Sequence, residues 1–189
     1  MDPTLSEEAL KCLPSLQSLA VVYRDRDVDP SRCHLKTWLR ELPQLAVLNI
    51  AKGHPVSAYA HSIPGTVTSL TLQRVMVEQK DMKTLGKQAS GLLHLHFDPC
   101  SYKSGSSIGE IPKIFPQLMT LKMRHYNVPE REFLSLQQLK HLERLEILDA
   151  QSPHLLQLIH KLQVLTNHST QIIHSRGLRD PTGCYCTHY

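Results

Sequence analysis

Hydrophobic residues recur along this chain in one short pattern, apolar-x-x-apolar-x-apolar. The pattern occurs six times in 189 residues, at 16–21, 45–50, 67–72, 92–97, 118–123 and 142–147. The first positions of successive copies lie 29, 22, 25, 26 and 24 residues apart. Because apolar and polar positions alternate at the end of each copy, each one predicts a short strand with its apolar side chains on one face.

The segments between these strands differ in how well they support a helix. Leu35, Trp38 and Leu39 follow the first strand at helical spacing, as do Met82, Leu85 and Ala89 after the third. Gly53 and Pro55 interrupt the second segment. In the fourth, we expect a flexible loop over 101–107 and a helix shortened by Pro112. The sixth segment is expected to be helical over 153–162.

We call the segments between these strands return segments, because each leads back to the start of the next strand. A strand and a return segment that repeat about every 20–29 residues are typical of leucine-rich repeats. The sequence therefore predicts an α/β leucine-rich repeat solenoid, or horseshoe, with a parallel sheet on the concave face and helices or irregular segments on the convex face. We place six to seven repeats in 1–165 and an irregular tail in 166–189. Residues 163–166 and 171–173 are candidates for further short strands.

Composition narrows the class of protein. Hydrophobic residues make up 41% and charged residues 20% of the chain, which is typical of a globular domain. The net charge of +4 is too small to favour nucleic acid as the partner. We find no apolar run that would span a membrane and no signal peptide. The odd number of cysteines, five, favours free thiols in a reducing compartment, and we expect a cytoplasmic or nuclear location.

The six repeats resemble those of intracellular leucine-rich repeat proteins, and their irregular spacing is most similar to the substrate-binding part of F-box/leucine-rich-repeat proteins. The resemblance covers about residues 5–165. It implies substrate recognition for a cullin-based ubiquitin ligase, but no F-box precedes the repeats. The family's Asn or Cys after the strand is matched only by Cys100. A capped helix over 4–12 looks like the end of an earlier repeat, which raises the alternative that this is part of a longer protein.

In such a repeat, the polar residues that alternate with the apolar ones face the concave side. There, the later repeats carry charged and histidine residues, and we expect these to bind an acidic or phosphorylated protein segment: Arg74, His94, His96, Asp98, Lys122, Arg124, His125, Arg144 and Glu146. An ordinary polar surface is the alternative. We expect reversal of both Lys122 and Arg124 to abolish partner binding and leave the fold intact.

Two clusters suggest metal chemistry. His94, His96 and Asp98 alternate along one strand, and Cys184, Cys186 and His188 lie close together near the C-terminus. An open concave face excludes little water, and Cys-x-Cys is not the usual zinc spacing, so we expect neither a catalytic residue nor a cofactor. The sequence thus predicts a non-enzymatic interaction module. A scaffold or regulatory repeat protein unrelated to ubiquitination and a zinc-binding module are the alternatives.

Overall fold

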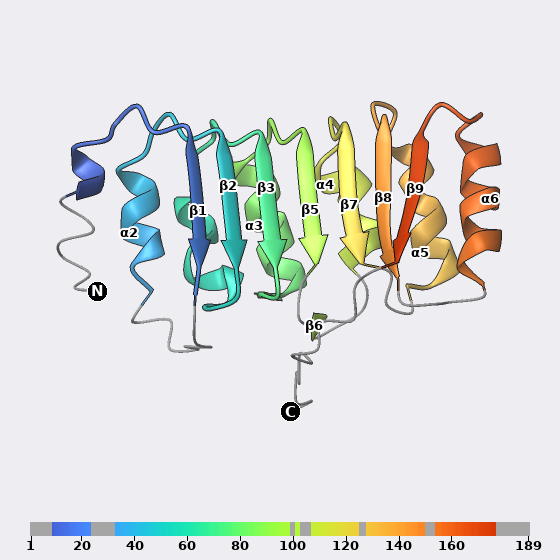
Figure 1. Cartoon of the computed structure of the whole chain (residues 1–189), viewed down its shortest axis with the longest axis horizontal. Coiled ribbons are helices and arrows are strands. Elements are labelled where there is room, and N and C mark those ends of the chain that lie inside the picture. Colours follow the sequence, from blue (N-terminus) through green and yellow to red (C-terminus); the bar gives the residue numbers. More distant parts are fainter. Residues whose placement is uncertain are drawn as a thin grey trace.

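The structure is a computed structural model that describes residues 9–23, 33–98, 101–102, 107–124, 128–149 and 154–176. Its seven longer strands are β1 (Ser18–Val22), β2 (Val47–Ala51), β3 (Ser69–Gln73), β5 (His94–Asp98), β7 (Thr120–Arg124), β8 (Arg144–Asp149) and β9 (Gln171–Arg176). They form one parallel sheet in the order β1-β2-β3-β5-β7-β8-β9, so neighbouring strands in this sheet also follow one another along the chain (Figure 1).

In each pair of neighbouring strands, equivalent positions of the repeated pattern lie opposite one another. The central apolar position of each copy faces the same position in the next strand, which gives a continuous row: Leu19, Leu48, Leu70, Leu95, Leu121, Leu145 and Ile172. From Leu48 to Leu145 this row is buried. The six predicted strands are therefore confirmed, and the repeated pattern sets their register.

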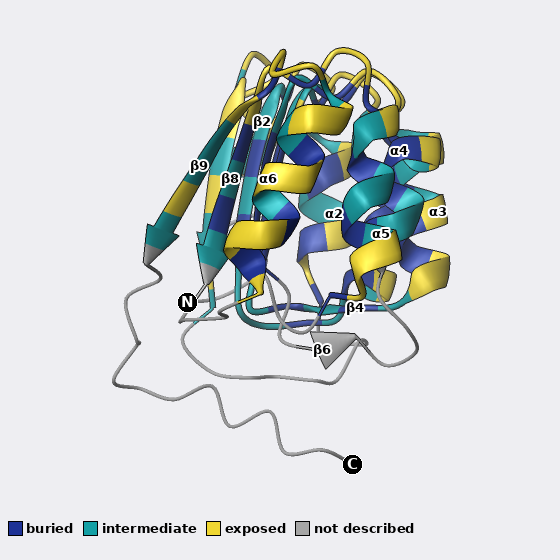
Figure 2. Ribbon diagram, turned by 90° about the vertical axis from the view of Figure 1, so that its right-hand side faces the viewer, coloured by how far each residue is buried: buried dark blue, intermediate teal, exposed yellow. Residues whose placement is uncertain are grey.

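Within the residues that the structure describes, the helices of the return segments cover one face of this sheet and leave the other uncovered (Figures 1 and 2). Their α-helices are α2 (Leu35–Arg40), α3 (Gln79–Gln88), α4 (Ile111–Ile114), α5 (Glu130–Leu134) and α6 (Leu155–Leu165). Leu35 and Leu39 of α2, and Met82 and Leu85 of α3, are buried as their spacing predicts. The core lies between the helices and the inner side of the sheet.

Where the sequence breaks the helical pattern, the return segments are irregular. Pro55 precedes two short 3₁₀ turns, η2 (Val56–Ala58) and η3 (Ala60–Ser62), instead of a helix. The fourth segment contains η4 (Ser107–Glu110) and the four-residue α4, with Pro112 near the start of α4. In the fifth, α5 is followed by η5 (Ser135–Gln138). Irregular segments are therefore found alongside helices, as expected.

The C-terminal part corrects two expectations. A short strand was predicted over 163–166, but residues 163–165 continue α6 instead. The helix ends only before Asn167 and His168, which have positive φ angles of 51° and 56°. Within the tail that we expected to be irregular from 166, β9 pairs with β8 over six residues. The candidate strand at 171–173 is thus confirmed, and the regular unit extends beyond 165.

The N-terminal helix, the loop after β5 and the absence of a membrane-spanning segment were also expected from the sequence. Residues 9–11 are helical, as expected for the end of a helix over 4–12, and the start of that helix lies outside the described residues. Ser101–Tyr102, in the expected loop, forms β6 and pairs with β4 (Met76–Val77) in a small parallel sheet that the sequence did not predict. Among the described helices, none combines the length and apolar character needed to cross a membrane.

Candidate functional site

The uncovered side of the sheet, which we call the open face, carries the side chains that alternate with the core residues. Its residues form three columns across the strands. The first is Ser18, Val47, Ser69, His94, Thr120, Arg144 and Gln171; the second is Ala20, Asn49, Thr71, His96, Lys122, Glu146 and Ile173; the third is Val22, Ala51, Gln73, Asp98, Arg124, Leu148 and Ser175. The three residues from β9 were not predicted for this face, because the seventh strand lies beyond the last clear copy of the pattern.

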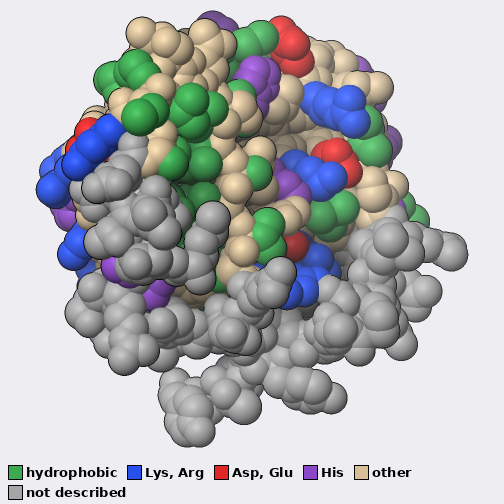
Figure 3. Space-filling view, turned by 60° about the vertical axis from the view of Figure 1, so that its left-hand side comes forward, with side chains coloured by type: hydrophobic (Ala, Val, Ile, Leu, Met, Phe, Trp, Pro, Cys, Tyr) green, Lys and Arg blue, Asp and Glu red, His purple; other side chains and the backbone are tan. Residues whose placement is uncertain are grey.

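The open face has two chemically different halves. On β1 and β2 it carries small and apolar side chains such as Ala20, Val22 and Ala51, and Val22 is 68% exposed. From β5 to β8 it carries the histidines and charged residues. Figure 3 shows one group of Lys, Arg, Asp, Glu and His side chains on the right of the view and a group of hydrophobic side chains to the left of it, with further charged side chains at the far left edge. This division agrees with the prediction from the sequence.

Asp98 and Arg124 form the most buried ion pair of the open face. Arg124 Nε donates to Asp98 Oδ1 at 2.7 Å, and Arg124 Nη2 donates to Asp98 Oδ2 at 3.0 Å. Asp98 is only 7% exposed. A bidentate pair with this geometry holds both side chains in place and fills both carboxylate oxygens. Arg124 therefore ties β7 to β5.

Glu146 is the second acidic residue of this half and lies between two cations. Its Oε1 is 2.8 Å from Lys122 Nζ, and its Oε2 is 3.8 Å from Arg144 Nη2. Ser175 on β9 donates to Oε1 at 3.4 Å. The hydrogen bond from Lys122 lowers the pKa of the Glu146 carboxyl. The side chain of Arg144 remains 52% exposed, so much of this guanidinium faces solvent.

The two histidines of β5 have different surroundings. His94 is exposed, and its Nδ1 shares a hydrogen bond of 2.9 Å with Thr120 Oγ1. His96 is half-buried, with Nδ1 3.4 Å from Gln73 Nε2 and with Nε2 buried without a hydrogen bond. Burial, and next the charge of Lys122, lower the pKa of His96. Its imidazole is therefore held toward the neutral form.

The metal hypotheses find no support in the described residues. There, no three His, Cys, Asp or Glu side chains are grouped so that they could hold an ion. Beside His94 and His96, the third candidate ligand, Asp98, already has both oxygens bonded to Arg124. Cys184, Cys186 and His188 lie outside the described residues, as does His125 of the predicted binding face.

Arg74 is the remaining predicted site residue. It follows β3 with a positive φ of 53°, and its backbone N–H donates to the carbonyl oxygen of Asp98 at 2.7 Å. This places Arg74 at the same edge of the sheet as Asp98 and Arg124. Of the predicted residues that the structure describes, all therefore lie on the open face or at the end of its strands.

The ion pairs correct one expectation about this face. Reversal of Lys122 and Arg124 was expected to leave the fold intact, but a glutamate at 124 would put a second carboxylate beside the buried Asp98. Removing one partner of a buried pair leaves the other charge uncompensated, which is strongly destabilising. Arg144 is the better position for a test of binding, because it is exposed and its contact with Glu146 is long.

Comparison of the sequence with models of known protein families gives no match, and comparison with curated proteins gives none either.

Proposed function

We propose that this chain is a leucine-rich repeat solenoid that acts as a non-enzymatic protein-interaction module and binds a partner segment on the open face. The observation that supports this most is that the repeat of the sequence pattern coincides with the repeat of strands in the sheet. Six copies of a sequence pattern become six parallel strands in register, each with three side chains on the same uncovered face. Such repetition gives a long surface on which an extended segment can lie.

The charges of the open face support an anionic partner segment. Four cations, Arg74, Lys122, Arg124 and Arg144, lie with two acids, Asp98 and Glu146, which leaves a formal charge of +2. The acids also fix Lys122 and Arg124 in place, so less side-chain entropy is lost when a partner binds. We propose an acidic or phosphorylated segment that runs from the charged half toward the apolar half.

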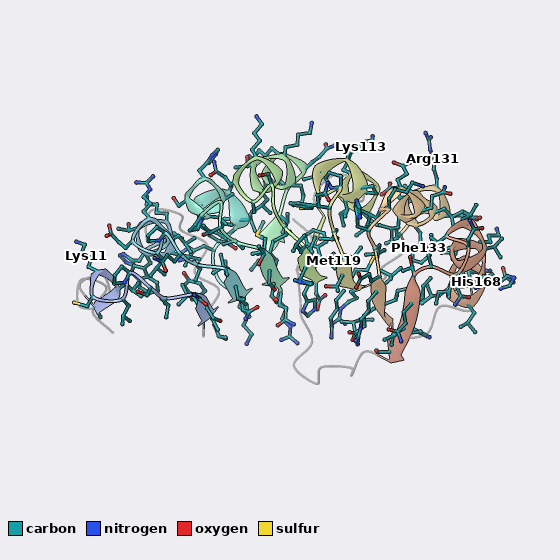
Figure 4. All side chains as sticks on the ribbon, turned by 90° about the horizontal axis from the view of Figure 1, so that it is seen from above. Lys11, Lys113, Met119, Arg131, Phe133 and His168 are labelled. Carbon is teal, nitrogen blue, oxygen red and sulfur yellow. The ribbon has the colours of Figure 1, made fainter. Side chains whose placement is uncertain are left out.

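The experiment is selection of ligands from a displayed library of random peptides, followed by affinity measurement with an enriched peptide and its phosphorylated form. We expect enrichment of acidic peptides, and Arg144→Gln should weaken their binding about three- to tenfold. Arg131→Gln is the matched control, because Arg131 is an exposed arginine on the helical side (Figure 4). Enrichment of neutral or basic peptides, or equal effects of the two variants, would contradict the proposal.

A narrower form of the proposal is substrate recognition for a cullin-based ubiquitin ligase, and its rival is a scaffold with no such link. Ligase subunits recovered with the protein from cells would favour the first. Zinc binding by Cys184, Cys186 and His188 is tested by the metal content of the purified protein. A structural zinc site contributes about 10 kcal/mol or more of apparent binding, so zinc should survive purification if the site exists.

A further inference from the structure

One position of the repeated pattern carries a large apolar residue in two neighbouring copies, although it is polar or small in the other four. It is the residue after the first apolar position, two before the central one. In four copies it is polar or small, namely Gln17, Ala46, Thr68 and Glu143, whereas in the β5 and β7 units it is Leu93 and Met119. The first-position residues Leu92 and Leu118 are fully buried, but Leu93 and Met119 are only half-buried. The core therefore does not require these two large apolar side chains.

Leu93 and Met119 lie side by side and line a hollow of about 360 Å³ at the start of β5, β7 and β8. Leu142, Gln117 and Ser169 also line it. Figure 4 looks down on this end of the strands and places Met119 on the sheet side of the molecule, away from Lys113 and Arg131. Two of its lining residues, Leu93 and Glu143, directly precede His94 and Arg144 of the first column of the open face.

Two backbone carbonyl groups at the hollow, those of Leu93 and Met119, are already hydrogen-bonded. The Leu93 carbonyl oxygen accepts from the N–H groups of Met119 and Thr120, at 2.8 and 3.0 Å. The Met119 carbonyl oxygen accepts likewise from Glu143 and Arg144, at 2.9 and 3.2 Å. With these carbonyls occupied, Leu93 and Met119 offer a ligand their half-buried apolar side chains. Such side chains favour an apolar group in the ligand.

The rim of the hollow adds charge. Lys140 and His141 are exposed and line it, and Arg144 is the next residue after Glu143 of the same rim. Within the part of the chain that the structure describes, Lys140 has no ion pair, so its ammonium group is available to an anion. Lys140 and Arg144 together outweigh the single carboxylate of Glu143. An anionic group beside the apolar one would therefore complement this rim.

We propose that this hollow binds an apolar side chain of the partner segment, with a neighbouring Asp, Glu or phosphorylated residue held by Lys140 and Arg144. This inference rests on the proposed function and states which partner segments would be preferred, namely those with a large apolar residue next to an acidic one. The apolar side chain is the anchor, because its burial contributes more than an exposed ion pair does.

The test uses the whole protein and the same displayed peptide library. The informative variants are Leu93→Thr and Met119→Thr, since threonine already occupies this position in the β3 unit as Thr68, where it is compatible with the fold. We expect enriched peptides to share an apolar residue beside an acidic one. Each variant should weaken their binding about tenfold or more, as expected for the lost burial of an apolar side chain. Leu156→Thr, at an exposed leucine of α6, is the matched control and should have no effect.

The outcomes separate this inference from the proposed function. Acidic peptides without a shared apolar residue, weakened by Arg144→Gln but not by Met119→Thr, would overturn the anchor and leave the interaction module standing. Failure to enrich any peptide would overturn both. Thermal unfolding of each variant, with an unchanged midpoint, establishes that a loss of binding is not a loss of fold.

Discussion

Arg124 and Arg144 lie on neighbouring strands of the open face, but the structure gives them different roles. Arg124 forms two hydrogen bonds to a buried carboxylate, whereas Arg144 makes one long contact and is half-exposed. Charge-assisted bidentate bonds are the strong ones, and exposed pairs contribute little. Arg124 therefore belongs to the structure of the face, and Arg144 is available for recognition.

This difference predicts unequal effects on stability. Arg124→Met should lower the free energy of unfolding by about 2 kcal/mol, because Asp98 would be left buried without its partner. Arg144→Met should change it by less than about 0.5 kcal/mol. Urea unfolding of both variants makes the comparison. Equal losses would show that the Asp98–Arg124 pair does not stabilise the fold, and recovery of stability in Asp98→Asn/Arg124→Met would support its role.

Asp81 is a buried acid away from the open face, at the start of α3. Its Oδ2 accepts the backbone N–H of Glu78 at 2.9 Å, in a capping box with Glu78. Burial raises the pKa of the Asp81 carboxyl. A carboxyl with a raised folded-state pKa favours the folded state most when it is protonated, so its contribution is present below the unfolded pKa of about 3.9 and is lost as the pH rises through the folded value.

Comparison with Asp81→Asn isolates this contribution. The unfolding free energy of the unchanged protein relative to the variant should fall as the pH rises from about 4 to 7. Urea unfolding at several pH values measures the difference. A difference that grows with pH would mean that a lowered carboxyl pKa, and hence a favourable charge, governs this site.

Among the elements, the turn after β2 depends on Gly53. Gly53 has a φ of +81°, and a Cβ there would lie 2.3 Å from Tyr23 Cδ2. The ring of Tyr23 also packs edge-on against that of His54, with centroids 5.2 Å apart. A side chain at residue 53 would therefore clash with the ring of Tyr23, the residue that follows β1.

Gly53→Ala should lower the unfolding free energy by about 2 kcal/mol, since it adds both backbone strain and a clash with Tyr23. Gly91→Ala is the control, because nothing lies within 4 Å of a Cβ at Gly91 and its φ is not positive. That change should be neutral or slightly stabilising. Thermal unfolding of the two variants tests this, and a neutral Gly53→Ala would contradict the geometry of the turn.

The elements also show what the sequence can predict. The six strands and their register follow from a repeated pattern, and Pro55 and Pro112 mark the irregular segments. The seventh strand is harder to see, because His174 occupies a position where the preceding units have an apolar residue. The site residues could be assigned to a face by alternation alone. Their ion pairs could not, because the burial of Asp98 and its bidentate bond to Arg124 depend on how neighbouring side chains pack.

Taken as a whole, the molecule has one surface covered by helices and another that is open (Figure 2). The charged half of the open face is held by ion pairs between β5, β7 and β8, and the hollow at Leu93 and Met119 adjoins it. A partner segment that lies along the first column would contact both Arg144 and the hollow. We therefore expect recognition to take place on the open face and not on the helical side.

The most direct measurement is backbone amide NMR of the whole protein, titrated with an acidic peptide from the library. We predict that the largest shift changes fall on β5, β7 and β8, at His94, Lys122, Arg144 and their neighbours, and that α3 to α6 change little. Changes concentrated on the helices, around Lys113 and Arg131, with the open face unaffected, would contradict recognition by the open face.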